Sequence, residues 1–141
     1  MNRIILAIAM AAIAVPAFAQ PVVPAQSLAP VETPPGKVQA LIKLGAEFPA
    51  MKGFDFSQTL TTVAPGTGRA LHTHTGAPEI VRILQGTLTD SRNGGPPTAY
   101  PAGSTLLNTA GTTHMWANLG TETVIFVNTV VRAEPAPAPA K

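Results

Sequence analysis

The chain of 141 residues contains no cysteine, and charged and aromatic residues are scarce. The absence of cysteine excludes disulfide bonds, cysteine-ligated metal sites and thiol nucleophiles. Charged residues make up 11% of the chain and the net charge at pH 7 is +2, whereas about a quarter of a typical globular domain is charged. The basic residues are too few and too scattered for a nucleic-acid surface. Because 45% of the residues are hydrophobic, the chain can bury a core, and its length predicts one domain.

The one long apolar run lies at the N-terminus. Arg3 precedes an uncharged segment from Ile4 to Val15, and Ala17-Phe18-Ala19 follows it. This order is typical of a secretory signal peptide that is cleaved after Ala19. A membrane anchor is the alternative, but the run is shorter than the roughly 20 residues that a spanning helix needs. We therefore expect residues 1–19 to be removed, and the protein to be periplasmic or secreted without a stable membrane anchor.

Proline-rich segments flank the part of the chain that we expect to fold. Residues 20–36 contain five prolines, and residues 133–141 are dominated by proline and alanine. Both compositions are typical of extended tails that do not pack into a core. We therefore expect a single folded domain over residues 37–132.

Within that domain, short β-branched runs separated by glycine and proline predict an all-β sandwich or barrel. The expected strands are Ser57–Val63, Ala70–Thr75, Glu79–Leu84, Thr87–Ser91, Ser104–Asn108, Thr113–Ala117 and Thr123–Val131. Residues 38–44 fit either a helix or a further strand, and the sequence leaves that choice open.

All three histidines of the chain fall in this β region. His72 and His74 are two positions apart on an expected strand, so both side chains project from one face. Glu79 begins the next strand after a short turn, and His114 lies on a strand further along the chain. Three imidazoles and a carboxylate suit a first-row divalent transition metal rather than calcium or magnesium. Taken alone, a histidine is more often a hydrogen-bonded core or surface residue, and a glutamate at the start of a strand is usually a solvated charge.

The spacing of these residues resembles the two sequence motifs of the cupin superfamily. The first motif consists of a glycine, two histidines one residue apart, a glutamate and a second glycine, and its matches here are Gly66, His72, His74, Glu79 and Gly86. The second motif is matched by Gly103, Gly111, His114 and Asn118. Thr109 departs from the pattern, because the family usually has proline there. That proline stiffens a turn and binds no ligand.

The resemblance covers residues 57–131 and implies a double-stranded β-helix, a jelly-roll barrel whose mouth holds a metal. By the same resemblance His72, His74, Glu79 and His114 would be the ligands of one divalent transition metal per chain. Iron, manganese, nickel, copper and zinc all suit these ligand types. Four protein ligands leave a coordination position open for water or substrate. Such an open position distinguishes a catalytic metal site from a structural one.

A few further residues are candidates for the walls of a substrate pocket. Trp116 is two positions from His114 and should share its face, although a core position fits this single tryptophan equally well. Thr62, Thr73 and Gln58 are the polar candidates in a mostly apolar interior. Arg69 precedes the histidine strand and could attract an acidic substrate, but its strand parity is opposite to that of the histidines, so we expect a solvated surface arginine.

The strand that begins at Glu79 is apolar on both faces. Val81 and Ile83 share the parity of Glu79 and should line the interior, while Ile80 and Leu84 face outward. An apolar outer face is expected where a second sheet or a partner subunit covers it. Because proteins of the similar family are often dimers, we expect a homodimer.

Two functions remain open. In the first, the protein is a small metalloenzyme, a quercetinase-like dioxygenase or an isomerase, that acts on a small organic molecule. Glu79 would then be the catalytic residue, alternating between ligand and proton acceptor. In the second, it is a non-catalytic exported protein that binds or senses a metal or a small ligand. A purely structural metal is a third interpretation. The fold alone cannot choose among these, since one fold supports many functions.

Overall fold

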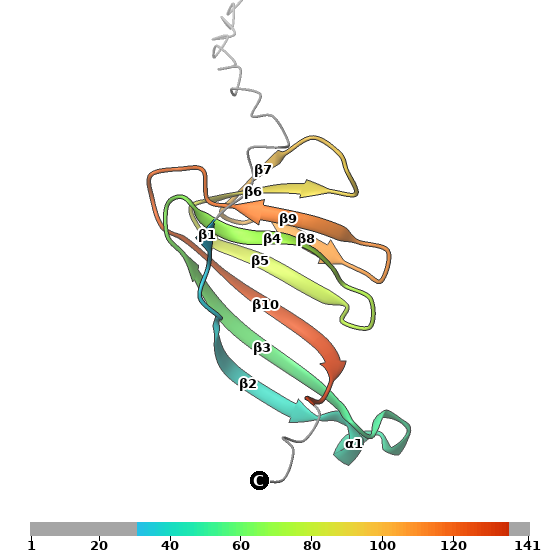
Figure 1. The fold of residues 1–141 in the computed structure, drawn as a ribbon. Helices are drawn as coiled ribbons and strands as arrows, with labels where there is room; N and C mark the ends of the chain where they lie inside the picture. Colours follow the sequence, from blue (N-terminus) through green and yellow to red (C-terminus); the bar gives the residue numbers. More distant parts are fainter. Residues whose placement is uncertain (1–30, 136–141) are drawn as a thin grey trace, which may run out of the picture.

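A computed structural model describes residues 31–135, which form two five-stranded β-sheets (Figure 1). The expected signal peptide (1–19), its cleavage site, residues 20–30 and residues 136–141 lie outside the described residues. Among the residues described, no helix is long and apolar enough to cross a membrane.

The two sheets draw their strands from alternating parts of the chain. The first sheet contains, in spatial order, β1 (Val31–Glu32), β4 (Thr67–Thr73), β9 (Thr113–Ala117), β6 (Thr87–Arg92) and β7 (Thr98–Pro101). The second contains β2 (Lys37–Lys43), β3 (Phe54–Val63), β10 (Val124–Ala133), β5 (Glu79–Gln85) and β8 (Thr105–Asn108). Successive strands from β3 to β6 cross from one sheet to the other, which is the winding of a double-stranded β-helix.

The expected all-β barrel is confirmed, and the ambiguous segment after residue 37 is now assigned. It forms strand β2, followed by the single helical turn α1 (Leu44–Glu47) and a 3₁₀ turn at Pro49–Met51. Figure 1 shows β2, β3 and β10 as long neighbouring strands that extend towards α1 at one end of the molecule. Strands β1 and β7 were not expected from the sequence.

The folded part begins before the expected boundary at residue 37. Strand β1 pairs in parallel with β4, with Val31 opposite Thr67 and Glu32 opposite Gly68. Gly36 is packed so closely that a Cβ atom there would lie 2.4 Å from Oγ1 of Thr61. The proline-rich stretch over residues 31–36 is therefore held against the barrel.

The hydrophobic core joins the inner faces of the two sheets at one end of the barrel. Its buried members are Val63, Val81, Ile83, Leu88, Leu106, Val124 and Phe126, and Tyr100 and Trp116 pack against them. Strand β5 has the alternation expected from the sequence, since Val81 and Ile83 are buried whereas Ile80 and Leu84 are exposed. The core closes one end of the barrel and leaves the other end open for a cavity.

Candidate metal centre

Strands β4 and β9 bring the three histidines together. His72 lies directly opposite His114 in the antiparallel register of these strands. His74 follows the end of β4, and its backbone N–H donates to the carbonyl oxygen of Thr112 over 3.1 Å, which extends the pairing by one step. One potential ligand atom from each histidine lies within 4.8 Å of those of the other two. The sequence prediction that the three imidazoles converge is confirmed.

Hydrogen bonds on the outer side of each ring fix the tautomer. Each Nδ1 atom lies beside an oxygen, at 2.8 Å for His72 and Ala70 O, 3.1 Å for His74 and Ala77 O, and 2.9 Å for His114 and Asp90 Oδ1. A carbonyl oxygen or a carboxylate only accepts hydrogen bonds, so Nδ1 carries the proton in all three rings. In the neutral form of each ring Nε2 then presents a lone pair, the form that a metal-binding histidine needs.

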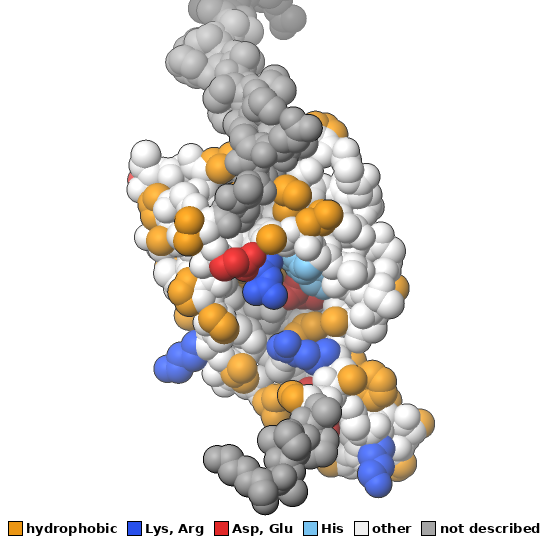
Figure 2. Space-filling view, in the orientation of Figure 1, with side chains coloured by type: hydrophobic (Ala, Val, Ile, Leu, Met, Phe, Trp, Pro, Cys, Tyr) orange, Lys and Arg blue, Asp and Glu red, His pale blue; other side chains and the backbone are white. Residues whose placement is uncertain are grey.

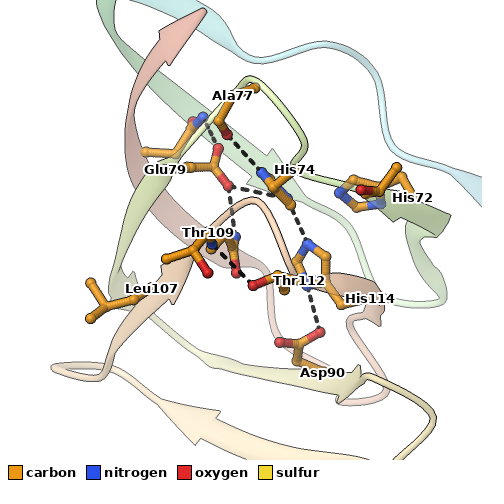
Figure 3. A network of polar contacts seen from close by, with 12 residues as sticks. His72, His74, Ala77, Glu79, Asp90, Leu107, Thr109, Thr112 and His114 are labelled. Carbon is orange, nitrogen blue, oxygen red and sulfur yellow. Dashed lines mark hydrogen bonds and ion pairs between the residues drawn. The ribbon is translucent and has the colours of Figure 1, made fainter.

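The lone pairs of two histidines face one another at short range. Nε2 of His74 lies 2.9 Å from Nε2 of His114 (Figure 3). When both rings are neutral, neither nitrogen can donate to the other, and two lone pairs at this distance repel. A cation between them removes the repulsion. The donor set, three neutral imidazoles with a carboxylate beside them, fits a divalent transition metal.

Burial favours the neutral form of the third histidine. It lowers the pKa of His72 below its ordinary value, and the neighbouring rings of His114 and His74 lower it further, against the opposing effect of the Ala70 carbonyl. The His72 ring centroid is 4.5 Å from that of His114. A neutral His72 can act as a ligand without first losing a proton.

Glu79 lies beside the histidine cluster, at the start of β5. Its Oε2 atom is 3.8 Å from Nε2 of His74. Two asparagine amides hold the carboxylate: Asn108 donates to Oε2 over 2.8 Å, and Asn128 donates to Oε1 over 2.5 Å. Figure 3 shows His74 between Glu79 and His114. The turn after His74 thus returns the glutamate to the histidines, as the sequence predicts.

The polar contacts close into a ring that joins the two sheets. Asp90 is fully buried and contacts His114 through Oδ1 and Arg92 Nε through Oδ2, the latter at 3.0 Å. Arg92 in turn donates to the side-chain oxygen of Asn108. We call this set the polar ring; its members are His74, His114, Asp90, Arg92, Asn108 and Glu79.

The sequence reasoning missed Asp90, Asn108 and Asn128. Each is a polar residue on the inward face of a strand whose inward neighbours are mostly apolar. That pattern was the available signal, since a buried polar side chain needs a partner. The partners themselves depend on which strands pair, and this was not known from the sequence.

The histidines open into a cavity of about 510 Å³. Core residues Val81, Leu88, Leu106 and Phe126 also line this cavity, and the backbone from Thr33 to Gly36 forms part of its wall. Figure 2 shows a histidine side chain at a hollow near the middle of this face, with basic and acidic side chains around it. The volume is that of a small-molecule site.

Trp116 has both of the roles that the sequence allowed. It lines the cavity, and its ring meets that of Phe126 edge-on with 5.5 Å between centroids. This contact with Phe126 restricts the rotation of the indole ring.

The structure corrects two of the predicted pocket residues. Gln58 and Thr62 are exposed on the outer face of β3 and do not line the cavity, whereas Thr59 and Thr61 do. Strand β3 has an unusual alternation, because its inward side chains are polar apart from Val63, whereas Phe54 and Phe56 are exposed. The hydrophobicity of its residues therefore did not indicate which side chains of β3 face the interior. The third polar candidate, Thr73, does line the cavity.

Arg69 is solvent-exposed as expected, with 53% of its side chain accessible, but the strand face expected for it is wrong. Arg69 lies opposite Trp116 and His72 lies opposite His114, so three steps along β4 match two steps along β9. This irregularity is a β-bulge, which reverses the parity of the residues on either side. Arg69 consequently shares the cavity face with Trp116 and lines the cavity.

A β-barrel of two wound sheets with three histidines at its open end is the architecture of a cupin-type domain. The family model described as "Cupin domain" matches residues 59–130, and the chain belongs to this family. No curated protein matches the chain.

Solved structures support the same fold. An uncharacterized conserved protein with a double-stranded β-helix domain from Klebsiella pneumoniae is 20% identical, with a TM-score of 0.56 over 81% of this chain and 90% of that one. A protein described as a predicted oxalate decarboxylase from Thermotoga maritima is 23% identical, with a TM-score of 0.50 over 57% of this chain and 83% of that one. At these identities the likeness establishes the fold alone.

Proposed function

We propose that the protein binds one divalent transition metal per chain at His72, His74 and His114, and that a small organic molecule binds beside it in the cavity. The observation that carries this proposal is the convergence of the three histidines, each of which has its Nδ1 atom hydrogen-bonded from outside. Glu79 is close enough to His74 to complete the ligand set, which would then be the set that the cupin motifs imply.

The favoured activity is that of a small metalloenzyme, a dioxygenase of the quercetinase-like kind or an isomerase. A metal held by the histidines would supply Lewis acidity to the bound molecule. The chain's own contribution is the fixed carboxylate of Glu79, which can take a proton from a substrate at Oε2, and an apolar wall that excludes water. Asp90 holds His114 in place during this chemistry.

A non-catalytic metal-binding or small-ligand-binding protein is the second candidate. It is favoured by the state of Glu79, because both carboxylate oxygens already accept hydrogen bonds from asparagine amides. These bonds fix the carboxylate and occupy an acceptor site on each oxygen, as in a carboxylate that positions a ligand.

Metal analysis tests the site. Mature, untagged protein should contain about one transition metal per chain, and the His72→Ala and His74→Ala variants should lose most of it. Their thermal stability should fall as well, because a metal that binds only the folded state stabilises that state. Gln58→Ala, on the outer face of β3, is the control and should keep its metal. Unchanged metal content in His74→Ala would refute the site.

Substrate and oxygen-uptake screens on the metal-loaded protein separate the two candidates. An enzyme should turn over a small organic molecule, and Glu79→Gln should lose turnover while the histidines still hold metal. A binding protein should show no turnover, and the wild type and Glu79→Gln should then bind the same ligands.

We also propose that the protein is exported after cleavage behind Ala19. Intact-mass measurement of exported material should give a chain that starts at Gln20. Retention of Met1 in that material would contradict the cleavage site.

A homodimer is proposed from the outer face of the second sheet. Ile42, Phe56, Ile80, Leu84 and Leu107 are all exposed there. An apolar area of this kind is expected to be covered. Sedimentation analysis should give a dimer that Ile80→Glu converts to monomer, and a monomeric wild type would rule it out.

A further inference from the structure

We propose that the ligand of this cavity is a small carboxylate with an apolar body, and that Arg69 and Arg132 recognise its charge. The inference rests on the proposed function, since it concerns the same cavity. It starts from two arginines that reach the cavity from different sheets, Arg69 from β4 and Arg132 from β10.

Arg132 lies on the inward face of β10. Asn128, Val130 and Arg132 alternate along the strand, and all three line the cavity. Asp55 is opposite Arg132 in the register of β3 and β10, but the ion pair of Asp55 is with Lys43, at 2.9 Å. Within residues 31–135 the guanidinium of Arg132 has no ion-pair partner, so it is available to a ligand.

Arg69 faces the cavity because of the bulge in β4. Its one ion pair in the described part of the chain is a loose contact of 3.6 Å between Nη1 and Oε2 of Glu32, and both side chains are about half exposed. The other oxygen of Glu32 accepts the backbone N–H of Ala70. A guanidinium has five N–H donors, so a single long contact leaves most of them free.

Two acidic side chains line the cavity as well. Asp90 is paired with Arg92, whereas two neutral amides hold Glu79 and leave its negative charge uncompensated beside His74. A divalent metal at the histidines would offset Glu79, and the two arginines would then make the cavity positive. Such a cavity attracts anions and repels cations.

The rest of the lining favours a carbon skeleton over a second polar group. Val81, Leu88, Leu106 and Phe126 form an apolar wall, and the indole of Trp116 offers a flat surface. Arginine matches the planar geometry of a carboxylate with two parallel hydrogen bonds. An organic acid with an apolar or aromatic body satisfies both parts of the cavity.

The chain carries its own reporter for this test, because Trp116 is its only tryptophan and lines the cavity. Tryptophan fluorescence should be titrated with benzoate against benzamide, and with propionate against propionamide. Within each pair the two probes have similar size, and they differ in charge. The acids should bind at least tenfold more tightly than their amides.

Arg69→Gln and Arg132→Gln should each weaken acid binding about tenfold and leave amide binding unchanged, because a charge-assisted hydrogen bond is lost. Arg82→Gln is the matched control: Arg82 lies on the exposed face of β5, where it donates to Thr105. It should bind both acids as the wild type does.

Metal content is measured in every sample, and each titration is run with and without metal. A protein without metal refutes the proposed function, but its arginines should still prefer acid to amide. If no acid binds better than its amide, or if both arginine variants bind acids as tightly as Arg82→Gln does, the inference is wrong. Tighter binding of phenyl phosphate than of benzoate would overturn the carboxylate assignment.

Discussion

Oδ1 of Asp90 lies 2.9 Å from Nδ1 of His114, and the two side chains are 0% and 3% exposed. The other oxygen of Asp90 contacts Arg92 Nε. Asp90 is therefore fixed between two partners, and it directs Nε2 of His114 towards the cavity. Among the three histidines, this is the one whose outer nitrogen bonds to a side chain rather than to the backbone, so it can be tested by substitution.

Asp90→Asn should weaken metal binding about 10- to 100-fold, as expected when the partner of a metal-binding histidine is altered. The amide is neutral and can turn its NH₂ group towards Nδ1. Competition with a chelator measures the affinity. Asp55→Asn changes another buried aspartate, one that pairs with Lys43 outside the cavity wall, and should retain wild-type affinity. Equal affinity in Asp90→Asn and wild type would show that Asp90 does not orient the ligand.

Substitution of two motif glycines by alanine distinguishes the effect of backbone strain on stability from the effect of steric crowding. Gly66 and Gly86 have φ values of +75° and +73°, but a Cβ atom would meet nothing within 4 Å at Gly66 and would lie 2.9 Å from the carbonyl oxygen of Thr123 at Gly86. Gly66→Ala should lower the free energy of unfolding by about 1–2 kcal/mol through strain. Gly86→Ala should lower it further, because a backbone carbonyl cannot easily move aside. Urea unfolding measures both, and equal losses would contradict the crowding at Gly86.

Asn118 holds together the backbone at the end of β9. Its fully buried amide donates to Val63 O over 3.0 Å and to Glu122 O over 2.7 Å. Asn118→Asp replaces this donor by a carboxylate that faces two carbonyl oxygens, and it should lower the free energy of unfolding by about 3 kcal/mol. The loss should shrink at low pH, where the acid is protonated and can donate again.

Asn93→Asp is the control for this substitution. The side chain of Asn93 accepts the N–H of Thr113 over 2.9 Å, and a carboxylate accepts equally well. Thermal unfolding of Asn93→Asp should match the wild type. A comparable loss in both variants would mean that the added charge, rather than the lost donor, is responsible.

Lys43 provides a prediction at alkaline pH. Its hydrogen bond to Asp55 raises the pKa of Lys43 above the ordinary 10.5, with a smaller rise from Glu134. A raised folded-state pKa means that this stability is fully present below pH 10.5 and is lost as pH rises through the folded-state pKa. Lys43→Gln should therefore be less stable than wild type at pH 8, and the difference should narrow above pH 10.5. Urea unfolding at both pH values measures it, with Lys52→Gln, at an exposed lysine, as the control. If the stability difference between Lys43→Gln and wild type is the same at both pH values, the ion pair is not its source.

Strand alternation predicted the site correctly where the strands are regular. The inward faces of His72, His114, Val81 and Ile83 follow from a period of two, and the structure confirms them. The rule failed for Arg69, because one extra residue in β4 shifts the phase. A bulge leaves no clear mark in this stretch of sequence, since no glycine or proline separates Arg69 from His72.

The inward face of β3 could not be predicted for a different reason. Its outward face mixes phenylalanine with polar residues, and its buried face is polar apart from Val63. The buried side chains of Thr59 and Thr61 line the cavity, so their burial depends on the position of the cavity. Strand pairing across the barrel decides that position, as it does the partners of Asp90, Asn108 and Asn128.

The wall formed by residues 33–36 affects how the protein should be shortened for experiments. Its composition invites removal, because prolines ahead of a barrel usually mark dispensable chain. Trimming to Lys37 would nevertheless delete β1, remove Glu32 as the ion-pair partner of Arg69 and take away one side of the cavity. The remaining strands and histidines would be unaltered in sequence, so a trimmed protein could take up metal normally and still give misleading ligand affinities. Any comparison of ligands should therefore keep every residue from Val31 onward.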